Sequence, residues 1–176
     1  MINVYTDEDL LKAKKQKNSL RNKLLISLAI VFVVNVAIFI FYLFQEFETK
    51  YRTPLIVTNI VICSVYAAIA LCVYEIKYKR VSNYYKLMVG IQTGLKTTGT
   101  NAFVRFDSSI TVKDGVDCIS MVVLQWSEKK QEYFERHVLC DLEKPLPSLN
   151  KGDVINYVTH ANVLVSYELS SPDIFG

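Results

Sequence analysis

Histidine and cysteine are scarce in this chain, which has two histidines and four cysteines. No two cysteines form a Cys-x-x-Cys pair, and neither His137 nor His160 lies at metal-ligand spacing from a cysteine. A zinc site therefore has no sequence support, and we expect no metal or other cofactor. Buried, reduced thiols are the state that we expect of the cysteines.

The sequence also lacks the motifs of common enzyme chemistry. It contains no GxGxxG or GxxxxGKS/T phosphate loop, no nucleophile elbow and no paired carboxylates or Ser/His/Asp set at a supporting spacing. Glycines at positions 90, 94, 99, 115 and 152 are scattered as turn and bulge residues would be. We therefore expect a protein that is not an enzyme.

Positive charge is depleted in the second half of the chain. Residues 1–90 carry a net charge of +6, whereas residues 91–176 carry −3. A nucleic-acid-binding domain needs a positive surface where it meets the phosphates, so we expect no nucleic-acid partner. The basic residues instead flank two apolar segments, where they would meet the anionic headgroups of a lipid bilayer.

Charged side chains are absent from two long apolar runs, residues 24–44 and 54–74. Each run is about 21 residues long and would span about 31 Å as a helix, which matches the hydrocarbon core of a bilayer. The first run is too long for a signal peptide and no Ala-x-Ala-like cleavage site follows it. The pattern predicts a transmembrane hairpin of two helices, and the missing intramembrane charges argue against a transport path.

The flanking charges predict the orientation of this hairpin. Six Lys or Arg residues lie in segment 1–23 and four follow the second run, whereas the loop 45–53 has only two. By the positive-inside rule both termini are cytoplasmic, and the loop is extracytoplasmic or lumenal. Segment 1–23 is interpreted as partly helical, with Thr6 as a helix N-cap, and segment 75–84 as a basic linker. A bacterial inner membrane and the endoplasmic reticulum both fit.

Polar and small residues inside the runs indicate how the helices pack. An amide in hydrocarbon seeks a partner across a helix contact, so Asn35 and Asn59 are expected to face inward. Cys63, Ala67 and Ala70 continue the face of Asn59, while Ser64 and Ala68 form a small-xxx-small pair on an adjacent face. That pair either packs within the hairpin or admits a helix of another chain. The predicted helix-packing residues are Asn35, Asn59, Cys63, Ser64, Ala67 and Ala68.

Residues 85–169 alternate between apolar and polar side chains, which predicts short strands. Lys113-Asp114-Gly115 supplies hairpin-turn chemistry. The result is a small antiparallel barrel or sandwich, OB-like or SH3-like, in the cytoplasm, followed by a tail at 170–176. The fold class is thus an α+β membrane protein. The predicted strands are residues 85–91, 101–106, 110–112, 116–126, 132–141, 154–159 and 163–168.

Four residues of the predicted domain are weak candidates for a ligand or interaction surface. Trp126 and Phe134 flank a hairpin and line either a pocket or the core. Arg136 and His137 belong to a polar patch on one strand. For His137 a cross-strand pair is favoured over acid–base catalysis, because no neighbour in sequence orients it or supplies a nucleophile.

Two functions fit these features. The first is a non-enzymatic, regulatory membrane subunit or adaptor, whose hairpin docks on another membrane protein or a second copy and whose β-domain serves protein–protein interaction. The second is a membrane-anchored receptor or effector, whose barrel binds a small ligand and whose hairpin oligomerises or perturbs the membrane. A membrane-bound enzyme is a third reading with less support, and transport or channel formation has less support still.

Overall fold

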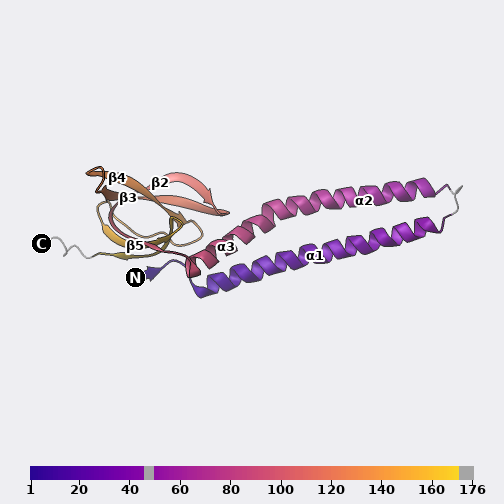
Figure 1. Cartoon of the computed structure of the whole chain (residues 1–176), viewed down its shortest axis with the longest axis horizontal. Coiled ribbons are helices and arrows are strands. Elements are labelled where there is room, and N and C mark those ends of the chain that lie inside the picture. Colours follow the sequence, from indigo (N-terminus) through magenta and orange to yellow (C-terminus); the bar gives the residue numbers. More distant parts are fainter. Residues whose placement is uncertain (46–49, 171–176) are drawn as a thin grey trace. The chain divides into compact units, whose positions relative to one another are not determined.

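The computed structural model of the chain describes residues 1–45 and 50–170, which form two compact units. The barrel unit consists of residues 1–13 and of the chain from residue 83 onward, and the hairpin unit consists of residues 14–82 (Figure 1). Most of the predicted tail and part of the predicted loop at 45–53 lie outside the described residues.

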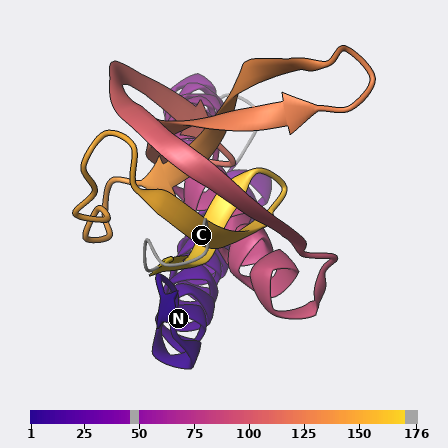
Figure 2. The ribbon, with the colours of Figure 1, turned by 90° about the vertical axis from the view of Figure 1, so that its left-hand side faces the viewer.

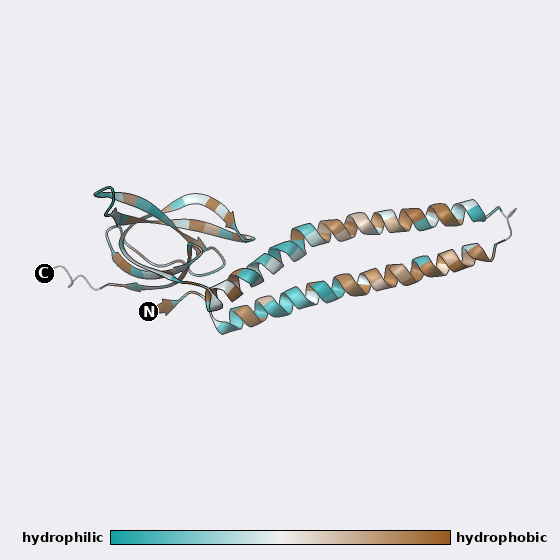
Figure 3. Ribbon diagram, viewed as in Figure 1, coloured by the Kyte–Doolittle hydropathy of each residue, from teal (hydrophilic) through white to brown (hydrophobic). Residues whose placement is uncertain are grey.

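The two apolar runs form parts of two long helices. Helix α1 is Asp7–Leu43 and helix α2 is Arg52–Val73, which continues through the π-helix η1, Tyr74–Tyr78, into α3, Lys79–Thr93. Both are long and apolar enough to span a membrane, and none of their most apolar stretches is buried in the chain itself. Figure 3 shows this apolar surface in brown on α1 and α2. The two predicted helices are confirmed.

Residues 85–91 form part of α3, so the strand predicted there is wrong. The alternation of Leu87, Val89 and Ile91 suggested a period of two, but Met88 is buried beside Leu87 and Ile91. Positions 87, 88 and 91 form one face of a helix, as spacings of three and four residues do. The predicted linker 75–84 is helical as well, and Gly90 lies within α3 rather than in a turn.

Five strands close into a barrel in the order β2-β3-β4-β6-β5, with β5 pairing back onto β2. Figure 2 shows the strands curving round a common interior. All pairings are antiparallel except β4 with β6, which meet in parallel at Leu139 and Val163. This is a five-stranded Greek-key barrel, the class that includes the OB fold. The strands are β1 Ile2–Asn3, β2 Thr97–Lys113, β3 Val116–Ser127, β4 Glu132–Asp141, β5 Val154–His160 and β6 Val163–Leu169.

Four of the seven predicted strands agree with β3, β4, β5 and β6 to within one residue, and besides residues 85–91 the differences concern β2 and β1. The segments predicted at 101–106 and 110–112 are one strand, β2, which continues through two register shifts in its pairing with β3. The short strand β1 was not predicted and pairs with β6. At the β2–β3 turn Asp114 and Gly115 have φ of 53° and 79°, the left-handed values that an Asp-Gly hairpin turn requires.

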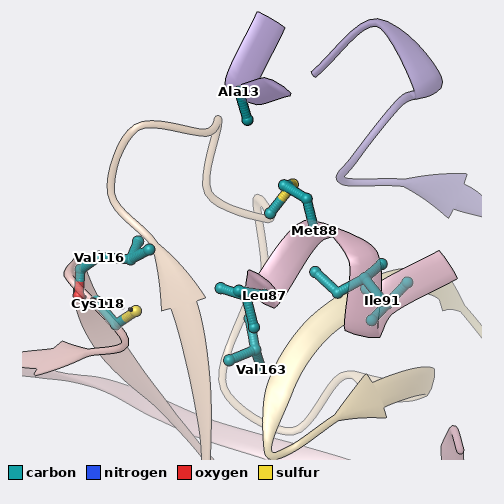
Figure 4. Packing of buried hydrophobic residues seen from close by; sticks show 8 residues of the cluster. Ala13, Leu87, Met88, Ile91, Val116, Cys118 and Val163 are labelled. Atoms are coloured by element: carbon teal, nitrogen blue, oxygen red, sulfur yellow. Dashed lines mark hydrogen bonds between the residues drawn. The ribbon is translucent and has the colours of Figure 1, made fainter. Parts of the chain in front are cut away.

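Two apolar clusters hold the barrel unit together. The barrel interior contains Met121, Ile155 and Tyr157, which are almost completely buried. The second cluster lies outside the barrel, where α3 packs on the strands, and Figure 4 shows Leu87 beside Val163. Free thiols contribute to both, Cys118 to the outer cluster and Cys140 to the inner one. The expectation of burial fails for Cys63 and Cys72, which are exposed on α2.

Candidate interaction surfaces

A hydrogen bond between side chains joins α1 to α2 near the basic end of the hairpin. The Tyr66 hydroxyl lies 3.0 Å from Ser27 Oγ, and Ser27 Oγ donates to the carbonyl oxygen of Leu24 at 2.9 Å. Since the Ser27 proton is directed at Leu24, Tyr66 is the donor across the helix pair. Both hydroxyls are thus satisfied within the hairpin.

Asn35 makes the second polar connection between the helices. Its Nδ2 donates to the carbonyl oxygen of Val31 at 2.7 Å, and its Oδ1 accepts from Cys63 Sγ at 3.1 Å. Asn59 is less well placed, because its Oδ1 is buried with no hydrogen-bond partner among the residues that the structure describes. The two asparagines therefore have opposite energetic roles in the hairpin.

Of the other predicted packing residues of α2, Cys63 contacts α1 through Asn35 and Ala67 lines a pocket together with Leu24 and Leu28 of α1, whereas Ser64 and Ala68 lie on the opposite side of the helix. Cys63, Ala67 and Ala68 are exposed, and so is Ser64, whose Oγ donates to the carbonyl oxygen of Ile60 at 2.8 Å. The half-buried residues of α2 follow a neighbouring row instead, namely Leu55, Asn59, Ile62, Tyr66, Ala70 and Val73. The structure thus leaves Ser64 and Ala68 on the outer surface of the hairpin.

In the barrel unit, the four predicted surface residues lie on two opposite faces of the sheet. In the β3–β4 register Trp126 pairs with Tyr133, and His137 pairs with Val122. Phe134 and Arg136 alternate with these and share the face of Val138, which belongs to the barrel interior. The four residues therefore do not form a single site.

The inner pair lies on the face of β4 that turns toward the barrel interior. Arg136 Nη1 donates to Gln125 Oε1 at 3.2 Å, and its guanidinium lies 5.9 Å from the centre of the Tyr157 ring. Phe134 is 42% exposed, so its ring lies at the rim. These contacts position Arg136 over the barrel core.

Of the outer pair, His137 belongs to a charge network that crosses β3. Arg105 on β2 donates from Nη1 and Nη2 to the Glu135 carboxylate at 2.7 and 2.9 Å, and this bond lowers the pKa of Glu135. Asp107 lies 3.4 Å from Arg105 Nε and 3.3 Å from His137 Nδ1. Val122 on the strand between them is completely buried. His137 thus takes part in a cross-strand ion-pair network on the barrel surface.

Beside this network lies an exposed aromatic patch, which we define as Leu124, Trp126 and Tyr133. The Trp126 and Tyr133 rings meet edge to face with centres 4.8 Å apart, and they are 45% and 66% exposed. Leu124 is 37% exposed on the same face of β3. Such amphipathic rings on an ordered strand pair suit protein contacts.

The N-terminal segment is tied to the loop after β4 by groups that the sequence did not reveal. Asp141, 2% exposed, accepts from the Tyr5 hydroxyl at 3.3 Å and from the Glu143 N–H at 2.8 Å. Lys144 Nζ lies 2.7 Å from Asp9 Oδ2. Burial opposes ionisation of Asp9, but hydrogen bonds from Lys144 and Thr6 outweigh it and lower its pKa. The only sequence signal was Thr6 as the N-cap, which does bond to Asp9.

Near the C-terminal end of α3, His160 packs against two glycines, Gly90 and Gly94. Its Nδ1 lies 2.9 Å from the carbonyl oxygen of Leu95. A Cβ on Gly90 would lie 2.5 Å from His160 Nε2, and one on Gly94 would lie 2.3 Å from His160 Cε1. These glycines allow the imidazole to approach the helix closely, which anchors the end of α3 on the β5–β6 turn.

Within the described residues, no group of three or more His, Cys, Asp or Glu side chains could hold a metal ion. The chain matches no protein-family model, no curated protein and no solved structure. Two surfaces bear on its function: the exposed small residues Ser64 and Ala68 of α2 and the aromatic patch of the barrel.

Proposed function

We propose that the chain is a non-enzymatic integral membrane subunit or adaptor with two spans. Its hairpin docks on another membrane protein or on a second copy, and its barrel presents a cytoplasmic surface for protein interaction. The observation that carries the proposal is the exposed apolar surface of α1 and α2, whose most apolar stretches contain no buried residue. Surface of this extent requires lipid or a protein partner.

The distribution of charge supports the orientation. Basic residues cluster before the apolar part of α1 and along η1 and α3, whereas the chain between the apolar parts of α1 and α2 has only two, Lys50 and, at the first residue of α2, Arg52. Lys and Arg resist translocation, so the barrel unit is placed in the cytoplasm.

The outer face of α2 supports docking to a further helix. Ser64 and Ala68 are exposed there, and small side chains allow two helix backbones to approach closely in a membrane. The Ser64 hydroxyl is satisfied by Ile60, so it does not oppose an apolar contact.

The aromatic patch supports a protein ligand for the barrel rather than a small molecule in its interior. Met121, Tyr157 and their buried neighbours fill that interior. On the outside, Trp126 and Tyr133 present rigid rings of the kind enriched in protein interfaces.

The proposal is tested by purifying the full chain from native membranes in mild detergent after chemical crosslinking. We expect a crosslinked partner or oligomer, and we expect Ser64→Leu with Ala68→Leu to abolish it. Val65→Leu is the matched control, because Val65 lies on another exposed part of α2 and already carries a branched side chain. Recovery of free monomer alone from the unmodified chain would contradict the proposal.

A further inference from the structure

A groove of about 620 Å³ lies between α1 and α2 inside the hairpin unit. Leu24 and Leu28 line it from α1, and Tyr66 and Ala70 line it from α2. Leucines on one helix face alanine on the other, so the small Ala70 side chain leaves room between the helices. The volume falls within the usual range of small-molecule sites.

The hydroxyl of Tyr66, which lines the groove, already has a hydrogen-bond partner within the hairpin. Tyr66 donates to Ser27 of α1, and Ser27 in turn donates to the carbonyl oxygen of Leu24. The groove therefore offers mainly aliphatic and aromatic surface, which suits a hydrocarbon chain better than a polar ligand.

One end of the groove is cationic and aromatic. Arg21 lines it there, together with Tyr74 and Tyr78, whose rings stack 5.4 Å apart on the π-helix η1. Single π-helical turns within helices frequently occur at functional sites. The neighbouring segments 14–23 and 77–80 are rich in Lys and Arg, and the one nearby carboxylate, Glu75, is paired with Lys79 at 2.8 Å.

We infer that this groove binds one acyl chain of an anionic phospholipid, with Arg21 contacting the headgroup. The inference rests on the proposed membrane insertion, which would bring the basic end of the hairpin to the headgroup region. Apolar walls specify the hydrocarbon chain, and the charge of Arg21 and its surroundings specifies an anionic headgroup over a zwitterionic one. Tyrosines at this level match the preference of amphipathic rings for the membrane interface.

The test is native mass spectrometry of the full chain, released from bilayers that contain phosphatidylglycerol and phosphatidylcholine in equal amounts. We expect one phosphatidylglycerol retained per chain, in preference to phosphatidylcholine by about fivefold, the factor expected for one basic residue near the headgroups. Arg21→Gln is expected to remove this preference. Lys23→Gln, which removes a charge outside the groove lining, is expected to keep it.

Filling the groove tests the acyl chain separately. Ala70→Leu and, independently, Leu28→Trp are expected to lower the retention of both lipids, whereas Ala29→Leu, outside the lining, is not. Two independent groove variants are used so that a folding defect in one of them does not decide the result. Each variant is compared with the unmodified chain in fractions that elute at the same volume.

Three outcomes would overturn the inference while leaving the proposed function intact: equal retention of the two lipids, equal loss of preference in Arg21→Gln and Lys23→Gln, or full retention in both groove-filling variants. Recovery of the chain in the soluble fraction after a carbonate wash would instead contradict the membrane insertion itself. The two failures are therefore distinguishable.

Discussion

At the residue scale, Asn35 and Asn59 differ in whether their amides are satisfied. Asn35 bonds to Val31 and Cys63, whereas Asn59 Oδ1 is buried with no partner in the described part of the chain. We expect Asn59→Leu to stabilise the hairpin by about 1 kcal/mol and Asn35→Leu to destabilise it by about 0.6 kcal/mol. Thermal unfolding of the full chain in detergent micelles measures both, and shifts of the same sign would refute the assignment.

Gly90 provides a second test at this scale. In an unobstructed helix Gly→Ala stabilises by about 0.5–1 kcal/mol. Here the new Cβ would lie 2.5 Å from His160 Nε2, so the ring must move and lose its bond to Leu95. We expect Gly90→Ala to lower the melting temperature and Gly90→Ala with His160→Ala to recover part of the loss, as a double-mutant cycle would show. Additive effects would argue against the contact.

At the element scale, the bond from Tyr5 to Asp141 ties the segment before α1 to the loop after β4. Burial and the Asp141 charge raise the pKa of Tyr5, so it remains a neutral donor at physiological pH. We expect Tyr5→Phe to destabilise the barrel unit by about 1–3 kcal/mol, because it leaves a buried carboxylate without this donor. Tyr133→Phe, at an exposed position, is expected to change stability by less than about 0.5 kcal/mol. Thermal unfolding of the two variants makes the comparison.

At the scale of the whole molecule, alkaline pH should weaken the barrel unit. Burial, followed by nearby acidic groups, raises the pKa of Cys118 from 9.0 to about 11, and burial first raises that of Tyr84 from 10.0 to about 12. The fold favours the neutral forms, so their contribution is complete below the ordinary thiol pKa of 9.0 and is lost as pH rises through 11. We expect a melting temperature that is level near neutral pH and falls above about pH 9. A melting temperature that already falls below pH 8 would contradict this prediction, because a group other than Cys118 or Tyr84 would have to titrate there.

The orientation of the whole chain is testable by cysteine labelling in intact cells. Lys50→Cys lies between the spans, and Lys129→Cys lies exposed in the β3–β4 turn. Under the proposed topology a membrane-impermeant thiol reagent modifies the first from outside and the second only after permeabilisation. The reverse pattern would invert the orientation, and labelling of both in intact cells would contradict the hairpin.

Local and periodic features were within reach of the sequence. The positions of the two apolar helices follow from runs without charge, and the β2–β3 turn follows from Asp114-Gly115, which are suited to its left-handed φ values. Strands β3 to β6 followed from their alternation. In each case the determining residues are neighbours in the chain, so no distant partner is needed to recognise them.

Tertiary structure decided what depends on partners far apart in the sequence. Residues 85–91 are helical because Leu87, Met88 and Ile91 fit together on the outside of the barrel, which outweighs the alternation that suggested a strand. Trp126 and His137 lie on the opposite face from Phe134 and Arg136 because side chains alternate along a strand, and barrel closure decided which face is inside and which is outside. The sequence by itself determined most of the elements and the apolar character of the two long helices, whereas tertiary packing decided which side chains meet, because contacts such as Tyr5 with Asp141 join residues that no local pattern connects.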